Sequence, residues 1–327
     1  MLILSKQDIK NIFSMRDAVA SVKQSFSIYS KGGSFVPLRV NIGVPKYSGQ
    51  SLFMPAYVPE LDSIGVKIVS IFPENAKRGM PSVQAQVLLL DGETGAVCCI
   101  LDGTYVTQLR TGAAAGAATD LLSKKDSKVG ALIGSGGQAL CQLEAMLAVR
   151  DLDIVKVYSP NFDHAKAFAE SAQKELQKFN TRITAVKNSD EAVFDADVIT
   201  TVTTAKQPTF NGKMVKKGAH INGVGSYTRE MIEMDEYIIR NADRIYVDSK
   251  EAVLAEAGEI IIPLEKGIIT EDIIYGELGD VINGIKKGRE NDSEITLFKT
   301  VGIAVQDVVT ASSIYKKAIE IGVGKNI

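Results

Sequence analysis

The first hundred residues change from a helical to a strand-like pattern of apolar positions. Ser5 and Ser14 each precede an aspartate by three residues, as in a capping box, and the second opens a helical pattern over AVASVKQSFSIY that ends near Gly32 and Gly33. Extended segments follow at 36–44, 51–58 and 64–71, and then a hairpin joins VQAQVLLL to AVCCIL through DGETG. We expect a helix followed by a mostly antiparallel sheet.

A long helix is expected from about Thr104 to Leu122. Its middle, TGAAAGAA, contains almost only small residues, and Gly112 and Gly116 lie four apart on one face. Because glycine inside a helix costs up to about 1 kcal/mol relative to alanine, this face indicates close helix packing, close approach to a ligand, or both.

The pattern changes again at Lys128. Short β-branched or apolar segments recur at 129–134, 155–159, 183–186, 197–203, 220–225 and 244–248, and helical or turn segments separate them. Such alternation predicts a parallel sheet with crossover helices. From about Glu294 the tail has a helical pattern. The chain is therefore expected to build a first domain, then a second, and to return to the first with its last helix, so that the domains are 1–123 with 296–327, and 124–295.

Composition excludes several classes of partner. The chain has 327 residues, 45% of them hydrophobic, and a net charge of -2, so it has room for two ordinary cores but no basic surplus to bind nucleic acid. Only four apolar residues precede the first charge, and no apolar run could span a bilayer, so neither a targeting segment nor a membrane partner is expected.

The cysteines favour a reducing, cytoplasmic location. There are three, Cys98, Cys99 and Cys141, and the first two are neighbours, so they do not form a disulfide framework. No cluster of histidine, cysteine and carboxylate residues has the spacing of metal ligands, so no metal is expected.

A glycine-rich turn stands between the strand VGALI and the next helix. It fits the dinucleotide fingerprint G-x-G-x-x-A, in which the first glycine makes the turn, the second lets the pyrophosphate approach, and the alanine lets helix and strand pack closely. The alternative is an ordinary glycine-rich turn. The position between strand and helix favours an α/β fold: a Rossmann-type doubly wound parallel sheet plus an α+β domain. The candidate cofactor residues here are Gly134, Ser135, Gly136, Gly137, Gln138 and Ala139.

The end of the second strand of this unit bears on cofactor choice. An NAD site usually has an acidic residue there to bind the ribose 2′-hydroxyl, whereas this chain has Ser159. The missing carboxylate favours NADP(H), with NAD(H) possible, since no arginine adjoins Ser159 to bind a 2′-phosphate.

Three cations lie in apolar surroundings in the first domain: Arg39 in VPLRVNI, Lys67 in IGVKIVSI and Arg110 in TQLRTGAAAG. Each alone is best explained as a snorkelling side chain or a structural ion pair. Together they indicate a pocket for an anion, for which a carboxylate is the first choice. A desolvated lysine can also donate or accept a proton. Glu74 and Asp102 could line the same cleft.

These features together resemble the ornithine cyclodeaminase/mu-crystallin family, over essentially the whole chain. Seven blocks in order carry the resemblance: Arg39 in PLR; Met54-Pro55; Gly65-Val66-Lys67 with Pro73-Glu74-Asn75; Leu109-Arg110-Thr111-Gly112-Ala113; the glycine turn at 134–139; His220-Ile221-Asn222-Gly223-Val224-Gly225; and Phe298-Lys299-Thr300-Val301-Gly302.

The resemblance implies a homodimer that acts on a small imino, amino or keto acid with a nicotinamide cofactor. The first domain would bind substrate and make the dimer contact. Arg39, Lys67 and Arg110 would hold the substrate carboxylate, with Met54 beside them, and Lys67 would also serve the chemistry. Thr111 and the glycine turn would hold the cofactor phosphates, while Val224, Gly225 and Val301 would lie near the nicotinamide. Thr203 also belongs to the expected cofactor set.

One departure from the family pattern bears on the substrate. The cyclodeaminases and similar archaeal alanine dehydrogenases carry an aspartate soon after the Val-Gly pair, where this chain has Ser226 or Tyr227. A site without that acid suits an imine that is already formed. The resemblance therefore favours a reductase of cyclic imino acids, either Δ1-pyrroline-2-carboxylate to L-proline or Δ1-piperideine-2-carboxylate to L-pipecolate.

Three alternatives stay open: an ornithine cyclodeaminase, an alanine dehydrogenase, and a non-catalytic protein that binds NADPH and a small ligand, as mu-crystallins do. Keeping all three cations favours an enzyme over a binding protein.

Overall fold

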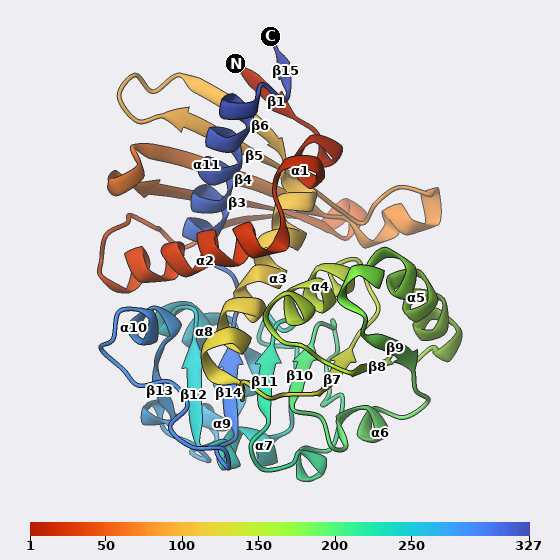
Figure 1. Cartoon of the computed structure of the whole chain (residues 1–327). Coiled ribbons are helices and arrows are strands. Elements are labelled where there is room, and N and C mark those ends of the chain that lie inside the picture. Colours follow the sequence, from red (N-terminus) through yellow and green to blue (C-terminus); the bar gives the residue numbers. More distant parts are fainter. The chain divides into compact units, whose positions relative to one another are not determined.

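The computed structural model describes all residues 1–327, which form two compact units (Figure 1). The first comprises Met1–Arg110 and Ile303–Ile327, and the second comprises Thr111–Gly302. The boundaries between the units therefore lie at 110/111 and 302/303, whereas the sequence predicts 123/124 and 295/296. The first falls inside helix α3 (Gly103–Leu122), because its residues pack partly with one unit and partly with the other.

The first unit is built on a seven-stranded mixed sheet, in the order β15-β1-β6-β5-β4-β3-β2. Its strands β1 and β6 are parallel, and the other neighbours are antiparallel. The expected antiparallel sheet is therefore present, with β1 and β15 added at one edge. The elements are β1 (Leu2–Leu4), α1 (Lys6–Ile12), α2 (Met15–Ser30), β2 (Val40–Val44), β3 (Gly49–Val58), β4 (Ser63–Ile71), β5 (Val83–Asp91), β6 (Val97–Asp102), the start of α3, α11 (Ala304–Ile321) and β15 (Lys325–Asn326).

Helix α11 lies along one face of this sheet, where it packs on β3, β4 and β5 and beside α2 (Figure 1). Its approach depends on Gly65 of β4, since a Cβ atom there would lie 2.9 Å from Cγ2 of Val308. Both capping boxes are present, at Ser5 and at Ser14, and they begin α1 and α2. The last helix therefore covers the face of β4 that carries Lys67.

The second unit is an eight-stranded parallel sheet with helices at its faces, in the order β13-β12-β14-β11-β10-β7-β8-β9. The run β9-β8-β7-β10-β11 has the 3-2-1-4-5 order of a Rossmann fold, which confirms the predicted fold class. The elements are β7 (Val129–Ile133), α4 (Ala139–Val149), β8 (Ile154–Tyr158), α5 (Phe162–Glu175), β9 (Arg182–Ala185), α6 (Ser189–Val193), β10 (Val198–Thr201), β11 (His220–Gly223), α7 (Glu236–Asn241), β12 (Arg244–Val247), α8 (Lys250–Glu256), α9 (Gly258–Glu265), β13 (Ile274–Glu277), α10 (Leu278–Ile282) and β14 (Thr296–Lys299).

The start of the C-terminal tail differs from its helical pattern. Residues 296–299 form β14, which inserts between β11 and β12, and the helix begins only at Ala304. Pairing with strands that are distant in sequence decides this structure, so local periodicity does not reveal it. None of the helices combines the length and the apolar character needed to cross a bilayer.

Candidate active site

Lys67 points toward the covered face of the first sheet. Alternate residues of β4 are buried, and Lys67 shares this buried face with Gly65 and Val69. Its register partner on β3 is Met54, and both side chains are almost completely shielded from solvent, with exposed fractions of 1% and 3%. The sheet thus places a lysine and a thioether side by side in an apolar layer.

Asp307, in the first turn of α11, links two of the expected cations. Nζ of Lys67 lies 2.7 Å from Oδ2 of Asp307, and Nε of Arg110 lies 2.9 Å from Oδ1. Arg110 also donates through Nη1 to Oε1 of Gln306 at 2.8 Å. The Asp307 side chain is fully buried. Lys67 and Arg110 therefore meet on one carboxylate that the sequence did not indicate.

The charges in this cluster do not balance. Burial, reinforced by the charge of Arg110, lowers the pKa of Lys67 to about 7 although Asp307 opposes the shift. Arg39 lowers the same pKa, so its guanidinium lies within electrostatic range of Lys67. Burial opposes ionisation of Asp307, but Arg110 and Lys67 outweigh it and hold its pKa below the ordinary value. Lys67 and Arg110 thus share the single carboxylate of Asp307, with the charge of Arg39 in range of Lys67, and a second anion would complete the cluster.

Gln306 contributes a further donor beside Arg110. Its Nε2 is buried and makes no hydrogen bond within the protein, while its Oε1 accepts from Arg110. A buried amide N–H without a partner is costly. A ligand carboxylate near the arginine would satisfy it. Gln306 and Asp307 lie in a helix of ordinary amphipathic pattern, so nothing in the sequence distinguishes them.

The glycine turn after β7 fits the phosphates of a dinucleotide. Gly134 has a φ of +113°, and a Cβ atom there would lie 2.6 Å from the carbonyl oxygen of Val202. At Gly136 a Cβ would meet nothing within 4 Å, so the backbone is open to a ligand. Helix α4 begins at Ala139 with no side-chain cap, and its dipole favours an anion at this end. Oε1 of Gln138 is buried without a hydrogen-bond partner.

The other expected phosphate contact lies in α3. Thr111 is buried, and its hydroxyl has no hydrogen-bond partner within the protein. One residue later, a Cβ at Gly112 would lie 2.4 Å from the carbonyl oxygen of Cys141 in α4. Gly112 therefore serves close helix packing, and the unsatisfied hydroxyl of Thr111 fits a ligand contact.

Ser159 follows directly after β8, and a cation lies at the neighbouring strand. Lys187 comes two residues after β9, the strand beside β8, and its Nζ lies 5.4 Å from the centre of the Phe162 ring. Phe162 opens α5, three residues after Ser159. The fold thus brings an exposed lysine to the β8–α5 turn, although no arginine adjoins Ser159 in the sequence.

The remaining expected cofactor residues lie in loops at the carboxyl ends of three neighbouring strands. Thr203 follows β10, Val224 and Gly225 follow β11, and Val301 follows β14. Two buried carboxylates hold these loops from within the unit. Glu233 accepts from the backbone N–H of Gly225 at 2.6 Å, and Asp248 accepts from that of Val301 at 3.0 Å. Neither Glu233 nor Asp248 belongs to a motif that is recognisable in the sequence.

Several other candidates have local structural roles. Asp102 accepts from the backbone N–H of Tyr105 at the start of α3, and the exposed Glu74 pairs with Lys77. His220 is buried between Thr296 and Asn222, and burial lowers its pKa to about 3, so it stays neutral. Burial raises the pKa of Cys99 to about 12, which leaves it unreactive.

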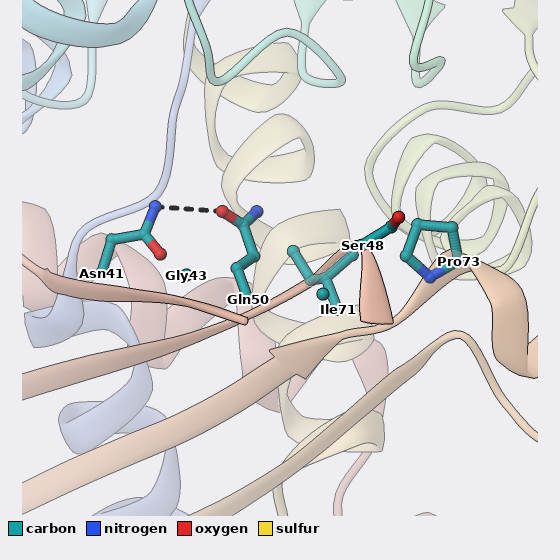
Figure 2. Close-up of a pocket in the computed structure, with 7 residues that line it drawn as sticks. Asn41, Gly43, Ser48, Gln50, Ile71 and Pro73 are labelled. Carbon is teal, nitrogen blue, oxygen red and sulfur yellow. Dashed lines mark hydrogen bonds between the residues drawn. The ribbon is translucent and has the colours of Figure 1, made fainter. Parts of the chain in front are cut away.

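An open cavity of about 330 Å³ lies at the end of the first sheet near β2, but it does not contain the cation cluster (Figure 2). It is lined by Asn41, Gly43, Ser48, Gly49, Gln50, Ile71 and Pro73. Nδ2 of Asn41 donates to Oε1 of Gln50 at 3.0 Å across it. None of the lining residues is ionisable, so the cavity offers no charge to bind a carboxylate.

The chain belongs to the ornithine cyclodeaminase/mu-crystallin family, whose model matches residues 1–322. It is 38% identical over 327 residues to the Delta(1)-pyrroline-2-carboxylate reductase of Bacillus cereus, and the match covers 100% of this chain and 99% of that protein. Its fold matches the Thermococcus litoralis Delta(1)-pyrroline-2-carboxylate reductase in complex with NADH and L-proline, with a TM-score of 0.95, 44% identity and full coverage of both chains. It also matches an archaeal alanine dehydrogenase dimer with bound NAD, with a TM-score of 0.91, 35% identity and 100% and 98% coverage.

Proposed function

We propose that this protein reduces Δ1-pyrroline-2-carboxylate to L-proline with a nicotinamide cofactor. The observation that carries the proposal is the buried cluster in which Lys67 and Arg110 share the single carboxylate of Asp307. The positive excess fits a substrate carboxylate. Two relatives with this activity in their names, at 38% and 44% identity over the full chain, support the same substrate.

The chain's own residues have distinct roles in this reaction. Arg39 and Arg110 bind the substrate carboxylate, and the hydrogen bonds of Arg110 to Asp307 and Gln306 fix its guanidinium in place. Lys67 hydrogen-bonds the same carboxylate and donates a proton to the imine nitrogen. Met54 packs beside Lys67 and keeps water from that side. When bound, the nicotinamide supplies the hydride that adds to C2, so the C=N bond becomes a C–N bond.

Substrate choice follows from the loop after β11. The family aspartate that would receive the amino group of an open-chain substrate is replaced here by Ser226 or Tyr227. The Ser226 hydroxyl donates to the carbonyl oxygen of Met231 and is fully buried. The carboxylate of Glu233, which does reach this loop, is engaged by backbone N–H groups. A preformed cyclic imine is therefore the preferred substrate, and the six-membered piperideine ring is the second candidate.

For the cofactor we propose NADPH, held by Thr111, the turn at 134–139 and the loops that contain Thr203, Val224, Gly225 and Val301. Ser159 offers no carboxylate to repel a 2′-phosphate, and the exposed ammonium of Lys187 can approach one. The solved relatives contain NADH or NAD, so the ratio of kcat/KM for NADPH and NADH is the test. Lys187→Glu should shift that ratio toward NADH, and an unchanged ratio would contradict the role of Lys187.

We also propose that the protein is a homodimer joined through the first unit. Strand β2 lies at the edge of its sheet, and the apolar side chains of Val40 and Ile42 on it are 55% and 52% exposed. An exposed apolar edge strand invites pairing with another chain. The archaeal alanine dehydrogenase with the same fold is a dimer.

The deciding experiment follows NADPH and NADH oxidation in separate reactions with Δ1-pyrroline-2-carboxylate, Δ1-piperideine-2-carboxylate, and pyruvate plus ammonia. Rapid oxidation with the pyrroline alone supports the proposal. Faster oxidation with the piperideine would mean that the preferred substrate has a six-membered ring. Oxidation only with pyruvate and ammonia would make the protein an alanine dehydrogenase. If none of these is turned over but ornithine releases ammonia, it is a cyclodeaminase. Cofactor binding without any turnover would indicate a binding protein.

A further inference from the structure

The order of strands in the second unit tells which loops face the nicotinamide half of a bound dinucleotide. In a sheet of this order, a bound dinucleotide would place its pyrophosphate at the turn after the first strand, here β7, and its adenosine ribose at the end of the second strand, β8. Its nicotinamide half would then extend to the other side of β7, toward the carboxyl ends of β10, β11 and β14. The loops after these strands hold Thr203, Gly225 with Ser226, and Val301.

Glu233 joins two of these loops through one buried carboxylate. Its Oε1 accepts from the backbone N–H of Thr203 at 2.5 Å, and its Oε2 accepts from those of Gly225 at 2.6 Å and Ser226 at 3.2 Å. Oε2 also accepts from the hydroxyl of Thr201 at 3.1 Å. A Cβ at position 225 would lie 2.6 Å from Oε1 of Glu233, so a glycine is needed for this approach.

The third loop is connected through Lys299 at the end of β14. Its buried Nζ donates to the carbonyl oxygen of Ser226 at 2.7 Å and lies 3.0 Å from Oε1 of the buried Glu259. The backbone of Glu233 is itself fixed, because its carbonyl oxygen accepts from both the N–H and the hydroxyl of Thr209. Burial raises the pKa of Glu233, while Lys299 opposes the shift. Such a desolvated cluster is costly and needs a reason beyond stability.

We propose that Glu233 is a positioning residue for the nicotinamide half of the cofactor: its carboxylate holds the loops after β10 and β11 in the geometry that binds the ring. This rests on the proposed nicotinamide-dependent function but not on the identity of the substrate. Glu233 reaches the two loops through the backbone N–H groups of Thr203, Gly225 and Ser226. It therefore affects the nicotinamide end of the cofactor and leaves the adenosine end unaltered.

The test compares the affinities of NADH and ADP-ribose by calorimetry in the parent protein and in Glu233→Gln. The amide NH₂ of a glutamine must face the N–H of either Thr203 or Gly225, so one loop loses its acceptor. Loss of a charge-assisted hydrogen bond changes an equilibrium by about tenfold, and we expect NADH to weaken by that factor. ADP-ribose, which lacks the nicotinamide, should bind as before.

A matched control removes a similar carboxylate at the amino ends of the same parallel strands, on the side of the sheet away from these loops. Asp197, just before β10, is also buried, and it accepts from the backbone N–H of Lys128 at 2.8 Å and Val129 at 3.0 Å. Asp197→Asn should lower stability without changing the ratio of the two affinities. If Glu233→Gln does not fold, Glu233→Asp keeps the charge on a shorter side chain, and the same ratio is measured.

The proposal would be overturned if the ratio of the NADH and ADP-ribose affinities stayed equal to that of the parent, whether neither affinity changed or both fell by the same factor. A second measurement is the primary isotope effect on kcat with NADH deuterated at C4. Misplacing the ring makes hydride transfer slower, so the isotope effect should rise in Glu233→Gln but not in Asp197→Asn. If the parent reduces no cyclic imine, the proposed function fails while the affinity ratio still decides the role of Glu233.

Discussion

The pKa of the buried Lys67 depends on its two charged neighbours, Arg110 and Asp307. A buried lysine without a counter-charge loses its proton, whereas one balanced by a full carboxylate stays protonated and inert. Here Asp307 divides its two oxygens between Lys67 and Arg110, at 2.7 and 2.9 Å. Burial and the charge of Arg110 lower the pKa of Lys67 to about 7, and Asp307 opposes them only in part, so Lys67 can lose or regain a proton at physiological pH.

Replacing Lys67 by methionine is the direct test of its role. Methionine has a similar length and suits an apolar layer, so the fold should survive. General acid catalysis typically contributes 10²–10⁴-fold, and we expect kcat for imine reduction to fall by about a hundredfold or more. NADPH binding, measured by fluorescence, should remain close to that of the parent. Full turnover by a folded Lys67→Met protein would remove Lys67 from the mechanism.

The pH dependence of the reaction should report the same group. Lys67 must be protonated to donate, so kcat/KM for reduction should decline as the pH rises above about 7. Asp307 raises the pKa of Lys67. Asp307→Asn should therefore move this decline to lower pH, a shift that titration of the substrate cannot produce. A decline at the same pH in both proteins would assign it to another group.

At the scale of single residues, the sequence indicates Lys67 but neither its partner Asp307 nor Glu233. Lys67 was conspicuous because it stands in an aliphatic strand, and a charge there needs an explanation. Asp307 lies 240 residues away, in the first turn of a helix, where an acidic residue is ordinary. Glu233 is equally inconspicuous, because its function lies in contacts with backbone N–H groups of loops. Partners that only the fold brings together leave no local pattern.

At the scale of elements, the site depends on how closely α11 approaches β4. Gly65 lies on β4 two residues before Lys67, and a Cβ there would lie 2.9 Å from Cγ2 of Val308 and 3.0 Å from the carbonyl oxygen of Leu88. Val308 follows Asp307 directly. The position that lets the helix pack therefore also sets the distance between Lys67 and its carboxylate.

Gly65→Ala should therefore push α11 away from the sheet. Overpacking of this kind costs about 1–3 kcal/mol, and the loss should appear in the free energy of unfolding by denaturant. Activity should fall as well, because Asp307 moves with the helix. Gly43→Ala on β2 is the matched control, since no atom lies within 4 Å of its Cβ position. Equal stability of the two variants would mean that the helix is free to shift.

Local signals identified the elements that local interactions determine. The capping boxes at Ser5 and Ser14 were visible because each residue and its partner are three positions apart. The glycine turn before α4 was visible for the same reason. The sequence predicts a helix where β14 lies, because its four residues become a strand only by pairing with β11 and β12. Long-range pairing is what single-sequence patterns do not contain.

At the scale of the whole molecule, the chain leaves its first unit and later returns to it. The sequence predicted this return from the change of pattern at Lys128 and the helical tail. The breaks between compact units fall at Arg110 and Ile303, because α3 and the loop after β14 contribute residues to both sides. The returning segment supplies Gln306 and Asp307. The cation cluster of the first unit is therefore complete only when the returning segment Ile303–Ile327 has packed against that unit.

The proposed dimer yields the last prediction. Apolar side chains on and around β2 are exposed, among them Phe35, Leu38, Val40, Ile42 and Tyr47. A lysine on an edge strand is a common device against pairing, so Ile42→Lys should halve the mass measured by light scattering. Ile285, in the other unit, is 64% exposed, and Ile285→Lys should leave the mass unchanged. A parent protein that is already monomeric would contradict the dimer. If the Ile42→Lys protein is still a dimer, the interface does not involve β2.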